Sequence, residues 1–267
     1  MRGKAGTCAA AWRSVGGRAD YVETEITTKG MEKYVVVTGG SKGIGRALVL
    51  RFLRAGHPVV TCARSAADLA RLQTDVWQQL PGAVLHTLPA DLSQAADCRR
   101  FTDFVLGLGE AVEILINNTG AFLPGRLQDE PADGSQLRQM LAVNLLSAYD
   151  VTLPLLPGLI ARRRGHIFNI CSTASIAAYP NGGSYGIAKH ALYGFTRNLR
   201  EELKEQGVRV TAVLPGATLT ASWEGVDLPA ERFIKAEDVA EAIFGAYSLS
   251  PQAVIEELLI RPQLGDL

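Results

Sequence analysis

A tyrosine and a lysine stand at positions i and i+4 of the segment Ser184-Tyr-Gly-Ile-Ala-Lys189, at the start of an apolar helical pattern. Residues at this spacing share one face of a helix, so we expect the ammonium group of Lys189 close to the phenol of Tyr185. A nearby cation lowers the pKa of a phenol from its ordinary value near ~10, which suits acid–base chemistry. The alternative for the pair alone is a packed ring and a solvated charge.

A serine upstream adds a third group. Ser172 follows a strand-like run and is expected to hydrogen-bond the oxygen that is reduced or oxidised. A metal site has little support, because the four histidines are scattered and form no helical ligand pair. They are His57, His86, His166 and His190.

Length and charge restrict the class of protein. The chain has 267 residues, 47% of them hydrophobic, which favours one large α/β domain. Its 27 acidic and 27 basic residues balance, so nothing indicates binding to nucleic acid or to an anionic membrane, and a small-molecule partner is expected. Pro154 and Pro157 are expected to interrupt the longest apolar stretches, which argues against a membrane span. The cysteines, Cys8, Cys62, Cys98 and Cys171, show no Cys-x-x-Cys spacing and suit reduced thiols in the cytoplasm.

The first thirty residues differ from the rest. Residues 1–30 lack helical or strand periodicity and do not read as a secretory signal or a transit peptide, so we interpret them as a disordered extension. Met31 is a possible natural start. Residues 31–267 are expected to form the domain.

From Tyr34 onward, short β-branched runs alternate with segments of period near 3.6, which predicts a parallel sheet with helices on both faces. Ser65 and Ser93 are expected to cap the second and third helices. The predicted strands are Tyr34–Thr38, Pro58–Ala63, Ala83–Pro89, Ile114–Asn117, His166–Cys171, Val208–Leu214 and Val254–Ile260. The predicted helices are Gly45–Ala55, Ala66–Gln79, Gln94–Leu108, Ser135–Arg163, Ser184–Gln206 and Ala236–Ser248.

The turn after the first strand is rich in glycine. Glycine permits positive φ and close approach of a pyrophosphate, and the free amides of the following helix point toward the anion. A tight strand-to-helix turn needs glycine for geometry as well. The candidate phosphate-binding residues are Gly39, Ser41, Lys42, Gly43, Ile44 and Gly45.

The second strand indicates which nucleotide binds. Its end carries Ala63 where an NAD site would carry an acidic residue, and Arg64 follows. Arg64 and Lys42 are expected to flank a 2′-phosphate, which favours NADP over NAD, unless both are ordinary surface charges. Asp91, with Leu92 beside it, is expected either to hydrogen-bond the adenine or to serve as a helix-entry aspartate.

Six motifs follow one another along the chain. They are Thr38-Gly-x-x-x-Gly43-Ile-Gly45, Asn117-Asn-Thr-Gly120, Asn144, Ser172, Tyr185-x-x-x-Lys189 and Pro215-Gly216. Together they resemble the classical short-chain dehydrogenase/reductase family. The resemblance covers the chain from about Met31 onward and implies a single Rossmann-type, doubly wound domain with a seven-stranded parallel sheet.

A second set of segments is similar to the bacterial sepiapterin-reductase-like members of this family. The segments are Arg64-Ser-Ala-Ala-Asp-Leu69, Gly165-His-Ile-Phe168, Pro215-Gly-Ala217 with Trp223 beyond it, and Glu256-Glu-Leu-Leu-Ile-Arg-Pro262 followed by Gly265-Asp266.

The resemblance implies roles for these residues. Tyr185 is the proton donor, Lys189 holds the nicotinamide ribose and depresses the pKa of Tyr185, and Ser172 polarises the carbonyl. Asn144 is expected to keep a water in a proton relay, or else to cap a kink in its helix. The resemblance also implies cofactor contacts by Asn118, Gly120, Pro215 and Gly216, and a carboxamide contact by Thr218 or Thr220.

Specificity is expected from the segments Ala121–Gly134, Ile176–Gly183 and Ala217–Ile234, which carry Phe122, Tyr179 and Trp223. They form an aromatic pocket or a lid over the cofactor. Sepiapterin reductases reduce a side-chain carbonyl of a pterin and anchor its guanidine-like edge with a carboxylate; the candidates are Asp266, Asp227 and Glu224.

Three functions follow as candidates. The first is an NADPH-dependent reductase of a ketone, and the second is a general carbonyl or 3-oxoacyl reductase. The third is a catalytically silent NADP-binding sensor or scaffold, which the presence of all four catalytic candidates disfavours. Excess apolar surface on the helices that carry Asn144 and Tyr185 is expected to form a homodimer or homotetramer.

Overall fold

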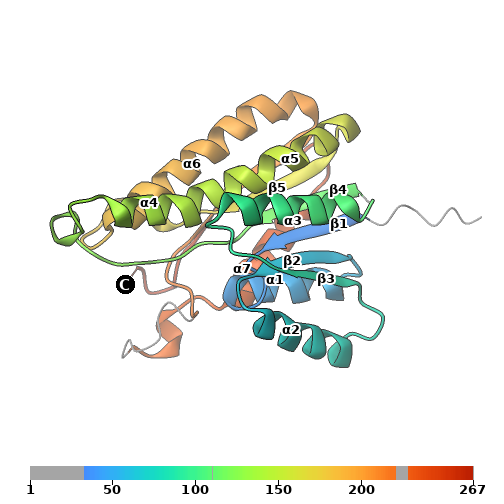
Figure 1. Ribbon diagram of the computed structural model, residues 1–267, viewed down its shortest axis with the longest axis horizontal. Coiled ribbons are helices and arrows are strands. Elements are labelled where there is room, and N and C mark those ends of the chain that lie inside the picture. The colour runs from blue at the N-terminus through green and yellow to red at the C-terminus, as the bar shows by residue number, and fades with distance from the viewer. Residues whose placement is uncertain (1–32, 110, 221–227, 267) are drawn as a thin grey trace, which may run out of the picture. The chain divides into compact units, whose positions relative to one another are not determined.

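The computed structural model describes residues 33–109, 111–220 and 228–266. The prediction for residues 1–30 lies outside them. The described chain contains one parallel sheet in the order β3-β2-β1-β4-β5-β6-β7 (Figure 1). Its strands are β1 (Lys33–Thr38), β2 (Val59–Ala63), β3 (Leu85–Pro89), β4 (Ala111–Asn117), β5 (Gly165–Ile170), β6 (Val208–Pro215) and β7 (Glu257–Ile260).

The central strands are buried on both faces, which explains their nearly continuous apolar sequence. Every residue of β4 and of β5 is buried. Strand β1 lies between β2 and β4, so the chain crosses over after β3 and continues the sheet on the other side of β1. The carboxyl ends of β1 and β4 form the crevice where ligands bind in open α/β sheets.

Helices cover the two faces of the sheet. On one face, α1 (Gly43–Arg54), α2 (Ala66–Gln79) and α7 (Ala236–Tyr247) share a hydrophobic core with Val35 and Ile116. On the other face, α3 (Ala95–Gly107), α5 (Ser147–Arg162) and α6 (Gly183–Leu203) pack over Val36 and Leu115. Figure 1 shows the two groups on opposite sides of the sheet. The predicted doubly wound fold with seven parallel strands is confirmed.

Shorter elements complete the described domain. Helix α4 packs against α6. The shorter elements are α4 (Ser135–Leu141), the π-helical turn η2 (Ala142–Leu146), and the 3₁₀ turns η1 (Leu127–Asp129), η3 (Thr173–Ser175), η4 (Lys204–Gln206) and η6 (Ala230–Arg232).

One long helical run, from Ser135 to Arg162, contains α4, η2 and α5. The run matches the predicted helix Ser135–Arg163 to within one residue, and Pro154 and Pro157 lie inside α5. Both prolines face away from the core, while Val151 packs into it, so tertiary packing outweighs the lost backbone hydrogen bonds.

By length and composition alone, the run Ser135–Arg162 is also long and apolar enough to cross a membrane. In the domain, however, it is a core helix, with Leu155 and Leu159 buried against the sheet. The absence of a membrane partner stays a prediction.

Two local expectations need correction. Ser65 caps α2, accepting a hydrogen bond from the Asp68 amide at 3.1 Å. Ser93 does not cap α3, because its hydroxyl donates to Asp91 at 2.8 Å and the helix begins after Gln94. Strand β7 begins at Glu257, not at Val254, since only its last four residues pair with β6.

Candidate active site

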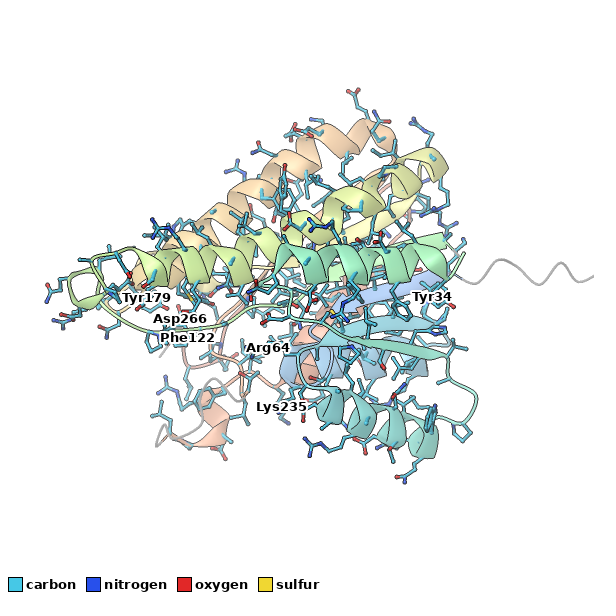
Figure 2. All side chains as sticks on the ribbon, in the orientation of Figure 1. Tyr34, Arg64, Phe122, Tyr179, Lys235 and Asp266 are labelled. Atoms are coloured by element: carbon cyan, nitrogen blue, oxygen red, sulfur yellow. The ribbon has the colours of Figure 1, made fainter. Side chains whose placement is uncertain are left out.

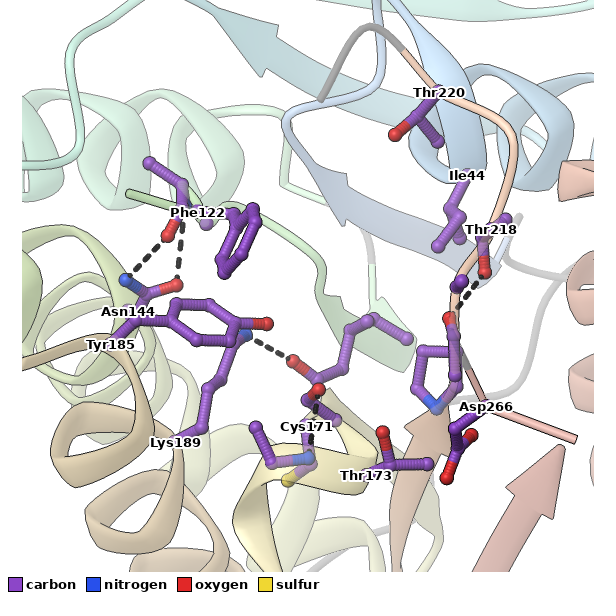
Figure 3. A pocket seen from close by; sticks show the side chains of 18 of the residues that line it. Ile44, Phe122, Asn144, Cys171, Thr173, Tyr185, Lys189, Thr218, Thr220 and Asp266 are labelled. Carbon is purple, nitrogen blue, oxygen red and sulfur yellow. Dashed lines mark hydrogen bonds between the residues drawn. The ribbon is translucent and has the colours of Figure 1, made fainter. Parts of the chain in front are cut away.

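Four predicted catalytic residues meet in one cavity of about 420 Å³ beyond the carboxyl ends of β5 and β6 (Figure 3). Ser172 follows β5, while Tyr185 and Lys189 come from the first turns of α6, and Asn144 from η2. The cavity thus joins three separate segments of the chain. Its lining contains Asn144, Ser172, Tyr185 and Lys189, as predicted.

Tyr185 is half-buried, with its phenol in the cavity. Burial raises its pKa to about 12, and a hydrogen bond with Ser172 acts in the opposite direction. Phe122 packs edge-on against its ring, with 4.9 Å between the ring centroids. The expectation of a lowered pKa is wrong for this structure, because desolvation outweighs the favourable contacts. Tyr185 is therefore a neutral phenol with a proton to donate.

Lys189 lies one helical turn further along α6. Its Nζ is 5.9 Å from the centroid of the Tyr185 ring and donates a hydrogen bond to the Ile170 carbonyl at 2.8 Å. The amine is buried, and this desolvation lowers its pKa to about 8. The ammonium form is thus less dominant near neutral pH than it is for an exposed lysine.

Ser172 is oriented by the short turn that follows β5. Its Oγ accepts from the Ala174 amide at 3.1 Å, and its own amide donates to Ser175 Oγ at the same distance. These reciprocal bonds form a capping box at the start of η3. The turn fixes the Ser172 hydroxyl beside Tyr185.

Asn144 is fully buried at the π-helical turn. Its side chain donates to the Ala121 carbonyl at 3.0 Å and accepts from the Ala121 amide at 3.2 Å. A Cβ placed on Gly120 would lie 2.8 Å from Asn144 Oδ1 and 3.4 Å from Lys189 Nζ, so the three groups lie close together. Asn144 lies at an irregularity of its helix, which agrees with the expected kink. Its role in a water relay stays a prediction.

A second cavity of about 380 Å³ begins at the glycine turn and continues to the ends of β2 and β3. It shares Ile44, Asn118, Gly120 and Thr220 with the first cavity. The predicted cofactor residues all line one cavity or both. Those in the second are Gly39, Ser41, Lys42, Gly43, Ile44, Gly45, Arg64, Asp91, Leu92, Asn118, Gly120 and Thr220, while Pro215, Gly216 and Thr218 line the first.

The glycine turn fits a pyrophosphate. Helix α1 begins without a side-chain cap and without an acidic residue in its first turn, so its first amides are available to an anion. The turn is also tightly packed, because a Cβ on Gly45 would meet the Gly39 carbonyl at 2.2 Å. Asn118 Nδ2 donates to the carbonyls of Thr38 and Gly39 and ties the turn to β4.

The two cations of the second cavity, Lys42 before α1 and Arg64 after β2, have different surroundings. Lys42 pairs with Asp68 at 2.9 Å, and this contact, with one from Arg71, lowers the pKa of Asp68 to about 2. Arg64 is exposed and makes no ion pair within the described part of the chain. Asp68 lines the second cavity together with both cations. The sequence patterns did not predict this position for Asp68.

Asp91 takes its expected helix-entry role, while its contact with the adenine stays a prediction. It lines the second cavity, but one carboxylate oxygen accepts from the Ser93 amide at 3.1 Å and from its hydroxyl. The Asp91 amide in turn donates to Asp97 at 2.7 Å. The helix-entry arrangement is thus present, and it leaves the carboxylate at the cavity wall.

Phe122, Tyr179 and Asp266, labelled in Figure 2, line the first cavity but not the second. Asp266 forms an ion pair with Arg261 through Oδ2, and its Oδ1 would lie 3.1 Å from a Cβ on Gly216. The other carboxylate candidates, Asp227 and Glu224, lie outside the described residues, as does Trp223.

The strand order, the glycine turn and the Ser172, Tyr185 and Lys189 cluster define a nucleotide-dependent oxidoreductase. The family model "short chain dehydrogenase" matches residues 33–229, and the chain belongs to this family.

Among characterised relatives, the chain is 32% identical over 245 residues to the sepiapterin reductase of Chlorobaculum tepidum, covering 89% of this chain and 99% of the relative. It is 34% identical to mouse L-fucose dehydrogenase, covering 72% of this chain and 67% of that protein.

Solved structures agree. An alcohol dehydrogenase from Thermococcus sibiricus, complexed with 5-hydroxy-NADP, superposes with a TM-score of 0.79 at 27% identity, covering 86% of this chain and 97% of the other. A metagenomic short-chain oxidoreductase in complex with NADP gives a TM-score of 0.75 at 28% identity, covering 87% and 97%.

Proposed function

We propose that this oxidoreductase reduces a ketone carbonyl to an alcohol with NADPH, and that Tyr185 donates the proton. The observation that carries the proposal is the position of the neutral Tyr185 phenol, beside Ser172, in a cavity that continues into the nucleotide cavity. When bound, the nicotinamide supplies the hydride. The chain's own residues align the carbonyl and supply the proton.

Each catalytic side chain has a distinct part. The Ser172 hydroxyl, fixed by η3, hydrogen-bonds the carbonyl oxygen and orients it toward Tyr185. Tyr185 then transfers its proton to that oxygen as negative charge develops there. The Lys189 ammonium stabilises the resulting phenolate and holds the ribose hydroxyls. Asn144, close to Lys189 across Gly120, keeps the water that returns the proton.

The cofactor is NADP(H). Arg64 and Lys42 both line the nucleotide cavity, and Ala63 stands where an acidic residue would be needed to bind the ribose of NAD. The NADP complexes of the two similar structures support this choice. The free amides at the start of α1 would hold the cofactor's pyrophosphate.

The substrate carries a planar, polar ring, as a pterin does. Phe122 and Tyr179 supply aromatic surface, and Asp266 places a carboxylate at the cavity wall. Oδ1 of Asp266 is the oxygen free of Arg261 and would accept from the guanidine-like edge of the ring. The similarity to the Chlorobaculum tepidum enzyme supports the same substrate class.

The test is the rate of NADPH oxidation with sepiapterin, an aromatic diketone and a 3-oxoacyl thioester, with Tyr185→Phe as the inactive control. Turnover of sepiapterin alone, lost in Asp266→Asn through a raised KM, supports the pterin substrate. A broad profile insensitive to Asp266→Asn identifies a general carbonyl or 3-oxoacyl reductase. NADPH binding without any turnover contradicts the proposal and favours a sensor.

The setting of the enzyme is also proposed. The three described cysteines, Cys62, Cys98 and Cys171, are free and buried, which suits the cytoplasm. The apolar surface on α5 and α6 suits a homodimer or homotetramer.

A further inference from the structure

Helix α6 carries Tyr185 and Lys189, yet its own sequence does not cap its N-terminus. The residue before it, Gly182, offers no side-chain cap, and its first turn contains no acidic residue. Uncapped helix amides must find another partner when they are buried. Ser184, which precedes Tyr185, is 1% exposed.

The missing cap comes from a distant segment. Glu130, 54 residues before Ser184, accepts from the Ser184 amide through Oε1 at 2.8 Å. Its Oε2 accepts from the Ser184 hydroxyl. Both carboxylate oxygens are thus used at the residue adjoining Tyr185, and the negative charge lies at the positive end of the helix dipole.

The backbone around this contact is built for close approach. Gly183 has a φ of +42°, and a Cβ there would lie 2.5 Å from Glu130 Oε1 and 2.6 Å from the Gly125 carbonyl. The Gly125 amide donates to the Asn181 carbonyl at 3.0 Å, and Asn181 itself has a positive φ of 66°. A side chain at position 183 would separate the two segments.

The segment Ala121–Gly134 is consequently held at two points of the active site. At its start, Asn144 bonds both backbone groups of Ala121, and Phe122 packs on the Tyr185 ring. Toward its end, Glu130 holds Ser184. The segment therefore links the two helices that carry the catalytic groups.

We propose that Glu130 is a positioning residue for Tyr185, acting through Ser184 to set the phenol against Ser172 and Phe122. The proposal rests on the proposed carbonyl reduction. Misplacement of a reacting group by about 1 Å can cost about 100-fold in rate. Glu130 lines neither cavity, and Lys189 is held separately by its hydrogen bond to the Ile170 carbonyl, so NADPH binding is expected to be independent of Glu130.

The test compares Glu130→Ala, Glu130→Gln and Asp129→Ala. A glutamine retains both hydrogen bonds, accepting from the Ser184 amide and donating to its hydroxyl. Asp129 is the matched control, an exposed neighbour in η1 whose side chain makes no hydrogen bond or ion pair with α6 among the described residues. We expect Glu130→Ala to lower kcat at least about tenfold, with Kd for NADPH within about twofold of the parent. We expect Glu130→Gln and Asp129→Ala to retain kcat within about threefold.

A Glu130→Ala variant with the parental kcat would overturn the proposal, and so would a glutamine as impaired as the alanine. A parallel loss of NADPH affinity would also overturn it, because that marks a general loss of fold. If Glu130→Ala does not fold, Ser184→Ala serves instead, because it removes only the hydroxyl contact. This variant should also lower kcat, by a smaller factor.

Hydrogen exchange separates this proposal from the proposed function. Glu130→Ala should speed deuterium uptake in the first turn of α6, whereas Asp129→Ala should not. Unchanged uptake overturns the positioning role even if no carbonyl is reduced. Absence of turnover by the parent protein, with faster uptake in Glu130→Ala, refutes the reductase alone.

Discussion

At the scale of single residues, the ionisation of Lys189 sets the expected pH dependence of the reductase. Burial places the pKa of Lys189 at about 8. The ammonium form, which holds the ribose and stabilises the Tyr185 phenolate, is present below that pH and is lost above it. We expect kcat/KM for NADPH to be level below about pH 8 and to fall about tenfold per unit above it.

The control for this profile is Lys189→Arg, whose guanidinium keeps its charge over the whole range. The kcat/KM that the variant retains should not begin to fall near pH 8, the pKa of the lysine. Initial rates of NADPH oxidation across the pH range measure both profiles. A break that persists in Lys189→Arg would assign the ionisation to another group.

Asp68 is expected to weaken the binding of NADPH. It holds Lys42 at 2.9 Å, so a 2′-phosphate must compete with the carboxylate for this cation. Because the pair lies near water, its strength is screened and the competition is modest. Asp68→Asn should therefore lower Kd for NADPH about 3- to 10-fold and leave Kd for NADH nearly unchanged.

The matched control is Asp75→Asn, on the same helix α2. Asp75 pairs with Arg46 at 2.9 Å and does not line the nucleotide cavity. Fluorescence titration of both variants with both nucleotides measures the effect. Weaker NADPH binding by Asp68→Asn would mean that the carboxylate orients Lys42 for the phosphate.

Sequence patterns identified the chemical groups of the site better than their electrostatic states. Residue types and spacing predicted Tyr185, Lys189 and Arg64, because these signals are local. The raised pKa of Tyr185 depends on burial by Phe122 and by segments far away in the chain. No local pattern links Lys42 to Asp68.

At the scale of elements, the packing of the glycine turn between β1 and α1 leads to a testable difference between two glycines. A Cβ on Gly45 would lie 2.2 Å from the Gly39 carbonyl, a contact that only backbone movement relieves. Gly45→Ala should therefore lower the melting temperature and abolish measurable NADPH binding. Gly245 is exposed within α7, and a Cβ placed on it would have no other atom within 4 Å.

Gly245→Ala is thus the matched control. Alanine is favoured over glycine in an exposed helix by about 0.5–1 kcal/mol, so this variant should be slightly stabilised and should bind NADPH normally. Thermal unfolding and nucleotide titration measure both variants. Normal binding by Gly45→Ala would contradict the close packing of the turn.

The order and type of the elements followed from periodicity because each strand and helix repeats its apolar residues locally. Pro154 and Pro157 lie within the helix that periodicity predicts, because the opposite face of α5 packs on the sheet. The feature that periodicity could not predict has a tertiary cause. The N-terminus of α6 is capped by Glu130 across 54 residues, a contact that no sequence window contains.

At the scale of the whole molecule, the apolar surface of α5 and α6 is expected to be covered by a second copy of the chain. Leu146, Tyr149 and Leu153 form one stripe at i, i+3 and i+7, and each is at least 41% exposed. The Tyr149 ring lies 5.3 Å from that of Phe195, which carries the surface onto α6. We therefore expect an interface between copies of the chain at this surface.

We expect the protein to be a dimer or tetramer, and Leu153→Glu to halve its mass, because two carboxylates would be buried at a symmetric contact. Trp77→Glu is the control, since Trp77 on α2 is 64% exposed and lies apart from α5 and α6. Light scattering after size exclusion measures the mass of each variant. An oligomer that survives Leu153→Glu would place the contact on another surface, and a monomeric parent would refute the interface.

The Leu153→Glu variant also tests whether the partner copy stabilises the catalytic helix, because α6 carries Tyr185. If the variant is dissociated but folded, its kcat is compared with that of the oligomer, and a lower value would mean that the partner copy stabilises α6.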